Sequence, residues 1–70
     1  MWKNGTINGY AYFAKCYETG SQYGIGGGCI SKLEIRKDGK TIYNFDRGLD
    51  FNNLDAEGKK AYAEILAKHN

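Results

Sequence analysis

The sequence contains no proline, two cysteines and one histidine among its 70 residues. A domain of this size has a thin core, and such domains usually gain stability from disulfides, a metal or a partner subunit. Cys16 and Cys29 lack the close spacing of a zinc site or a disulfide-rich scaffold, so we expect them to be reduced, half-buried apolar side chains. Of these three sources of stability, only a partner subunit is compatible with the composition.

The single histidine, His69, lies one residue from the end of the sequence, where a chain is expected to fray. A catalytic dyad of Cys29 and His69 is therefore not expected. Nothing in the sequence places two carboxylates in one pocket for acid–base chemistry. We therefore expect a protein without catalytic residues, metal or cofactor.

Long hydrophobic runs are also missing. No segment approaches the roughly 18 apolar residues of a membrane span, and residues 1–4 show no apolar signal segment. The sequence therefore predicts a soluble, cytoplasmic protein without membrane contact. Its formal net charge of +2 is small, whereas dedicated nucleic-acid-binding domains are usually strongly basic.

Glycine, by contrast, is abundant, and it concentrates in the segment 20–28. The segment lacks the third glycine and the following helix of a dinucleotide-binding fingerprint, and it lacks the Lys-Ser or Lys-Thr of a P-loop. Two interpretations remain. The segment is a wide connection or sheet-edge bulge, or it is a partner-contacting loop with Tyr23 and Ile25 at its tip.

The rest of the chain reads as one domain over residues 1–70, because no linker or repeat divides it. Asn8-Gly9 is a strong signal for a two-residue turn and predicts a hairpin of strands 2–7 and 10–17. Neither face of the second strand is clearly polar. We expect one face to cover the core and the other to keep exposed aromatics, and the pattern leaves open which face a helix covers.

Residues 29–36 alternate in polarity and predict a third strand with Leu33 and Ile35 in the core. A fourth strand follows the turn at residues 37–40, and two registers are open for this hairpin. A two-residue loop sets Ile42 beside Ile35. A three-residue loop with a glycine bulge sets Tyr43 beside Leu33 and turns Phe45 inward, and we favour this second register.

Residues 47–53 are expected to form a loop, after which Asn53 or Asp55 caps a helix over residues 56–68. The apolar stripe of this helix consists of Ala61, Tyr62, Ile65 and Leu66. The stripe must pack on the sheet. The predicted fold is therefore α+β, with a four-stranded antiparallel sheet of two hairpins and one C-terminal helix packed on one face.

An acidic segment precedes the helix, with oxygen-bearing side chains at the alternate spacing of a calcium loop: Asp46, Asp50, Asn52, Asp55 and Glu57. Phe51 occupies the sixth position, where such a loop needs glycine for its sharp turn, so no metal site is expected. We expect Arg47 to pair with one of these carboxylates, and the others to serve as turn and cap residues.

Positive charge gathers in the second hairpin, at Lys32, Arg36, Lys37 and Lys40. Together with the tyrosines of the sheet, these residues could contact backbone phosphates and stack bases. Glu34 and Asp38 dilute this charge. Binding to nucleic acid is therefore the alternative function.

Three segments carry a resemblance to known sequences: residues 2–9, 26–35 and 44–50. In these segments the chain is similar to a family of short, uncharacterised proteins of Gram-positive bacteria and their phages. Leu49 departs from the family pattern, in which an aromatic residue takes this position. The resemblance implies no activity, but it implies that the protein is encoded by a phage or another mobile element. Small proteins of such elements often cover a surface of a larger host or defence protein.

The leading hypothesis is a small non-enzymatic protein-binding module, an inhibitor of a host or anti-phage defence complex. The expected contact residues are Tyr10, Tyr12, Tyr23 and Ile25, with Arg47 and Asp46 holding the neighbouring loop in shape. A third interpretation is a self-associating domain, a homodimer in which an unpaired strand edge or an aromatic face pairs with a second copy.

Overall fold

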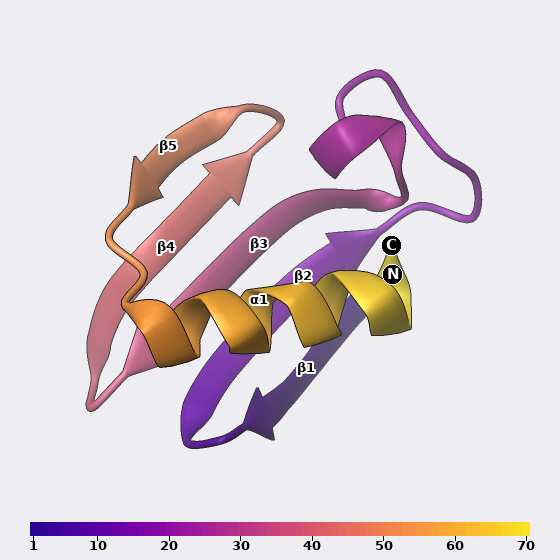
Figure 1. Cartoon of the computed structure of the whole chain (residues 1–70). Helices are drawn as coiled ribbons and strands as arrows, with labels where there is room; N and C mark the ends of the chain where they lie inside the picture. Colours follow the sequence, from indigo (N-terminus) through magenta and orange to yellow (C-terminus); the bar gives the residue numbers. More distant parts are fainter.

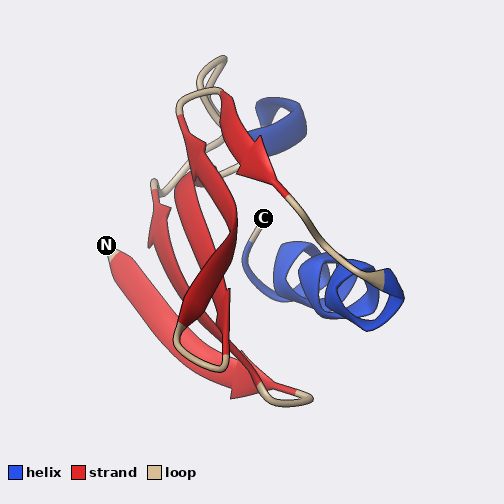
Figure 2. Cartoon of the chain, turned by 90° about the vertical axis from the view of Figure 1, so that its left-hand side faces the viewer, coloured by secondary structure: helices blue, strands red, loops and turns tan.

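One antiparallel sheet and one α-helix on one of its faces make up the computed structural model, which describes all residues 1–70 (Figure 1, Figure 2). The sheet has five strands, and they follow one another in chain order from β1 to β5. The elements are β1 (Trp2–Ile7), β2 (Tyr10–Cys16), the 3-10 helix η1 (Ile25–Gly27), β3 (Ile30–Lys37), β4 (Lys40–Asp46), β5 (Leu49–Asn52) and α1 (Ala56–His69). The α+β class with a C-terminal helix is confirmed, whereas the expected count of four strands is wrong.

Two tight turns shape the first four strands. Asn8 and Gly9 have φ angles of 52° and 83°, and Asp38 and Gly39 have 53° and 77°. Positive φ at both central residues is the mark of a two-residue turn whose twist matches the flanking strands, and Asn-Gly and Asp-Gly adopt it most readily. The first hairpin therefore forms as expected, although β2 ends at Cys16.

The second hairpin differs from the favoured register. Its loop has two residues, and the extra residue is Ile42, which forms a bulge inside β4. Beyond this bulge Tyr43 lies opposite Ile35, and Phe45 lies opposite Leu33. Phe45 thus turns towards the core as expected. The cause of this orientation is the bulge within β4, whereas a three-residue loop was expected to cause it.

The fifth strand, β5, lies where a loop was expected. Its register sets Asn52 opposite Tyr43 and Phe51 opposite Asn44. The reversal from β4 to β5 depends on Arg47, which adopts a φ of 58° although it is not a glycine. The segment lacks the Asn-Gly or Asp-Gly signal of a tight hairpin, so the sequence did not indicate this turn.

Helix α1 begins at the expected cap. The Asp55 carboxylate accepts hydrogen bonds from the Gly58 amide, at 2.6 Å, and from the Tyr10 hydroxyl, at 2.7 Å. Ala61 and Ile65 of the predicted stripe are fully buried against the sheet. The whole core comprises Tyr10, Tyr12, Ala14, Cys16, Ile25, Ile30, Leu33, Ile35, Tyr43, Ala61 and Ile65. At 14 residues, the helix is neither long nor apolar enough to cross a membrane.

The glycine-rich segment is a packed connection between β2 and β3. Ile25 of η1 is buried in the core, so it does not stand at an exposed loop tip as expected. The Asn70 side chain accepts a hydrogen bond from the Ile30 amide and donates one to the Ile25 carbonyl, both at 2.9 Å. Gly24 lies so close to the Gly28 carbonyl that a Cβ would overlap it. Glycine is used here for close backbone approach.

Candidate functional site

The expected contact residues Tyr10 and Tyr12 lie in the core, on the sheet face that α1 covers. Each places its hydroxyl at the edge of the core beside a polar partner, since Tyr10 donates to Asp55 and Tyr12 contacts His69 Nε2 at 2.9 Å. The hydrogen bond to Asp55, aided by burial, raises the pKa of Tyr10 to about 12. The expectation that these tyrosines are exposed is therefore wrong: with their hydroxyls satisfied, both rings can be buried.

Of the other residues of this hypothesis, Ile25 is buried, whereas Tyr23 and Arg47 are exposed. The Tyr23 amide donates to Ser21 Oγ within the glycine-rich segment. Arg47 Nε lies 3.6 Å from Asp46 Oδ1, which confirms the expected pairing with a nearby carboxylate. No hydrogen bond or ion pair joins Tyr23 to Arg47.

The four basic residues of the alternative hypothesis do not form one free cationic surface. Lys32 Nζ lies 3.7 Å from Asp46, and Arg36 Nε lies 2.9 Å from Glu34. Lys37 Nζ stands 4.8 Å from the centre of the Tyr10 ring, and Lys40 is exposed at the hairpin end. Three of the four charges therefore already have partners within the chain.

The sheet face away from α1 has no covering element, as Figure 2 shows. The strand register defines two rows of side chains across this surface, which we name the open face. The first row is Asn4, Phe13, Glu34, Asn44 and Phe51, and the second is Trp2, Lys15, Lys32 and Asp46. The exposed fractions of Trp2, Phe13 and Phe51 are 61%, 39% and 47%. Three large aromatic rings therefore face solvent on one rigid sheet.

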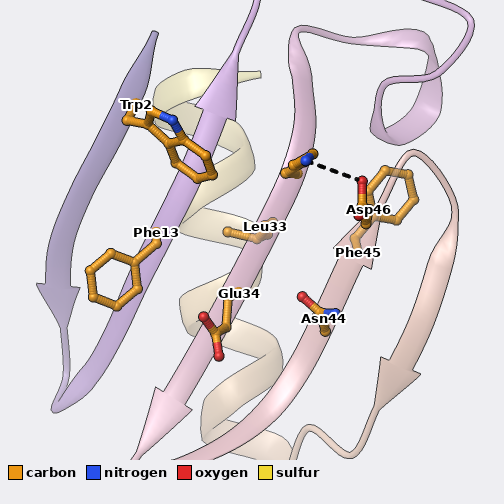
Figure 3. Close-up of a pocket in the computed structure, with 8 residues that line it drawn as sticks. Trp2, Phe13, Leu33, Glu34, Asn44, Phe45 and Asp46 are labelled. Carbon is orange, nitrogen blue, oxygen red and sulfur yellow. Dashed lines mark ion pairs between the residues drawn. The ribbon is translucent and has the colours of Figure 1, made fainter.

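A shallow hollow of about 130 Å³ lies within the open face. Figure 3 shows Trp2 and Phe13 at one side of it and Asn44 and Asp46 at the other, with the ion pair of Lys32 and Asp46 at its end. The hollow thus has an aromatic side and a polar side.

The polar side of the hollow is internally ordered. Glu34 accepts hydrogen bonds from Arg36 Nε at 2.9 Å and from Thr41 Oγ1 at 2.6 Å. These two bonds lower the pKa of the Glu34 carboxyl, and the bond from Arg36 has the larger effect. The carboxyl group therefore stays ionised. The Arg36 guanidinium also lies 5.7 Å from the centre of the Phe13 ring. This network fixes the rotamers around the exposed aromatics.

The described residues include no metal cluster and no disulfide. No group of three or more His, Cys, Asp or Glu side chains is placed to hold a metal ion, and Cys16 and Cys29 are free thiols. The open face offers flat aromatic surface, two ion pairs and amide groups, which together suit contact with another macromolecule.

Sequence reasoning missed Trp2 and Phe13 as a surface pair. The Asn8-Gly9 turn sets Trp2 opposite Lys15, which shares a strand face with Phe13, so their common face was deducible. That this face is the uncovered one was not deducible, because the opposite face of β2 is just as rich in aromatics.

A family described as a domain of unknown function, DUF7678, matches residues 1–70, and the chain belongs to this family. No curated protein and no solved structure matches the chain.

Proposed function

We propose that this member of the DUF7678 family is a small protein-binding module that contacts its partner through the open face. The observation that carries the proposal is the exposure of Trp2, Phe13 and Phe51 on a sheet face that no element of the chain covers. Tryptophan and other large aromatics dominate the energy of protein interfaces, because they bury much area and lose few rotamers.

The surroundings of these rings match the anatomy of an interface. The ion pairs Lys32–Asp46 and Arg36–Glu34 lie beside the aromatic side chains and supply polar contacts next to an apolar centre. The rings project from strands β1, β2 and β5, whose backbone is held by the sheet. Little conformational entropy is therefore lost when a partner docks.

The dimensions also suit such a role. The molecule measures 31 × 20 × 18 Å, so one broad face has a footprint of roughly 600 Å². A standard interface buries about 800 Å² on each partner. The open face alone is smaller than this, so a contact of standard size would extend over its rim.

The partner that we propose is a larger protein of the host cell, within an anti-phage defence complex that the module inhibits. This assignment is supported by the resemblance to short proteins of Gram-positive bacteria and their phages. An inhibitor of this kind needs shape and a few aromatic anchors, and the open face supplies both.

The test is affinity capture of the tagged protein from a lysate of its natural host, with and without nuclease, followed by mass spectrometry. The double variant Trp2→Ser/Phe13→Ser should lose the captured complex. Leu49→Ser is the matched control: its side chain is 61% exposed, as that of Trp2 is, but pairs with Phe45 on the other sheet face. Circular dichroism checks that both variants are folded.

Capture that survives in the double variant would remove the open face from the interface. Recovery of nucleic acid that nuclease abolishes would favour the alternative function through Lys32, Arg36, Lys37 and Lys40. Recovery of the protein alone would favour self-association, which light scattering over a dilution series then measures.

A further inference from the structure

A second hollow, the largest in the structure at about 380 Å³, lies between edge strand β1 and the C-terminal end of α1. Its lining includes Lys3, Tyr17, Glu18, Lys68 and His69. Lys3 sits opposite Ala14, which is buried under α1, so its side chain belongs to the helix side of the sheet. The hollow is therefore separate from the open face.

The positive charges in this hollow have no partner. Neither Lys3 nor Lys68 takes part in any of the four ion pairs of the structure. Glu18 lines the same hollow, and Glu64 lies one helical turn before Lys68, yet neither reaches ion-pair distance of a lysine. Two ammonium groups from different elements thus line one hollow without an ion-pair partner.

The pKa of His69 is affected by the same two unpaired lysines. Burial lowers its pKa first, and the charges of Lys3 and Lys68 lower it further. Its Nε2 contacts the Tyr12 hydroxyl, and Nδ1 has no hydrogen-bond partner in the protein. A neutral ring with one unoccupied nitrogen therefore stands beside two lysines.

The helix dipole explains only part of this arrangement. Cations are favoured in the last turn of a helix, which accounts for Lys68 and His69. It does not account for Lys3, which comes from the opposite end of the chain and is brought to the same place by the register of β1. An anion from outside the chain would supply the negative charge that is missing beside Lys3, Lys68 and His69.

We propose that this hollow binds the phosphate group of a nucleotide-sized ligand, with Lys3 and Lys68 neutralising the phosphate and Tyr17 stacking on the base. A phosphate monoester carries close to two negative charges at neutral pH, which matches two lysines. Lysine ammonium groups are common phosphate ligands, and 380 Å³ falls within the usual size of small-molecule sites. Tyr17 is exposed at the rim, where a base can reach its ring.

The test is an NMR titration of the full chain at constant ionic strength with pyrophosphate, a nucleoside monophosphate and a short single-stranded oligonucleotide. Saturable shifts at Lys3, Tyr17 and His69 are expected. The double variant Lys3→Gln/Lys68→Gln should weaken binding by about tenfold or more, since it removes two charged contacts. Lys59→Gln, at the other end of α1, should change it by less than about twofold.

His69 provides a readout that needs no variant. A bound phosphate favours the protonated imidazole, so the pKa of His69 should rise when the ligand is added. The other titratable groups that line the hollow belong to Met1 (its α-amino group), Lys3, Cys16, Tyr17, Glu18, Cys29 and Lys68, and the Tyr12 hydroxyl faces the ring. The His69 ring protons, followed from pH 5 to 8, report this shift directly.

Shifts that do not saturate, an unmoved His69 pKa, or an equal loss in Lys59→Gln would each overturn the proposal. Tighter binding of the monophosphate than of pyrophosphate, which carries more negative charge, supports stacking on Tyr17, and the absence of Tyr17 shifts with the monophosphate overturns that role. Tighter binding of the oligonucleotide, with affinity that falls steeply in salt, would identify a nucleic-acid backbone as the source of the phosphate.

Discussion

The side-chain amide of Asn70 donates a hydrogen bond of 2.9 Å to the carbonyl oxygen of Ile25 and so ties the residue after α1 to the glycine-rich segment. Its carbonyl oxygen accepts from the Ile30 amide at the start of β3. One side chain thus joins the helix, the 3-10 turn and the sheet.

Replacing Asn70 with alanine should destabilise the protein by about 1–2 kcal/mol, because the buried Ile30 amide loses its acceptor and the Ile25 carbonyl keeps only the Gly28 amide as a donor. Urea unfolding measures the loss, and amide hydrogen exchange should accelerate over residues 24–30. Asn53→Ala is the control, since the Asn53 side chain is exposed and makes no hydrogen bond. Equal losses in the two variants would contradict the structural role of Asn70.

Gly24→Ala should be more damaging than Gly48→Ala. At Gly24 a Cβ would overlap the backbone carbonyl of Gly28, which cannot move aside as a flexible side chain could. We expect a loss of about 1–3 kcal/mol. At Gly48 no atom lies within 4 Å and φ is not positive, so alanine should be neutral or slightly stabilising there. A comparison of the two urea midpoints measures the difference.

Ile65→Ala should leave much of the protein unfolded at 25 °C. Ile65 is fully buried where α1 meets the sheet, and such truncations cost about 2–5 kcal/mol. The core of so small a domain rarely supplies more than about 3–5 kcal/mol. The neighbouring exposed residue gives the control, since Glu64→Ala should stay within about 0.5 kcal/mol. A cooperative thermal transition at the wild-type temperature in Ile65→Ala would show that the helix is not essential to the core.

Asp55 should make the protein sensitive to acid. Hydrogen bonds from Tyr10 and from the Gly58 amide lower the pKa of its carboxyl below the ordinary value of 3.8. The unfolded chain therefore binds the proton more tightly, so this stabilisation is present above pH 3.8 and is lost as the pH falls through the lower folded-state pKa. Urea titrations at a series of pH values from 6 to 2 should show a smaller acid loss in Asp55→Asn than in the wild type.

An acid loss of the same size in Asp55→Asn would assign the effect to other carboxylates. Glu34 is the first of these, since Arg36 and Thr41 lower its pKa as well. Glu34→Gln therefore serves as the second arm of the same experiment.

The local features of the chain were predictable because they depend on neighbours in sequence. Asn8-Gly9 adopts positive φ at both residues and so determines the first hairpin. Asp55 caps α1 because its carboxylate lies within reach of the Gly58 amide. The strand with Leu33 and Ile35 in the core followed from alternation alone.

The candidate site was not predictable to the same extent. The sequence placed aromatics on both faces of β2, and only the docking of α1 decided that Tyr10 and Tyr12 are buried while Phe13 is exposed. Likewise, Ile25 is buried in the core, and the Asn70 side chain, 45 residues away in the chain, binds its carbonyl. Strand β5 formed through a positive φ at Arg47, for which the local residues gave no signal.

Sequence by itself therefore determined the Asn8-Gly9 turn, the helix with its cap, and the α+β class, since these follow from φ preferences and periodicity within a few residues. Tertiary structure decided which face is open, where β4 bulges at Ile42, and that Lys3 and Lys68 line one hollow. These features depend on contacts between residues far apart in the chain. Such contacts form where the helix and sheet bury the most apolar surface together, which no single segment specifies.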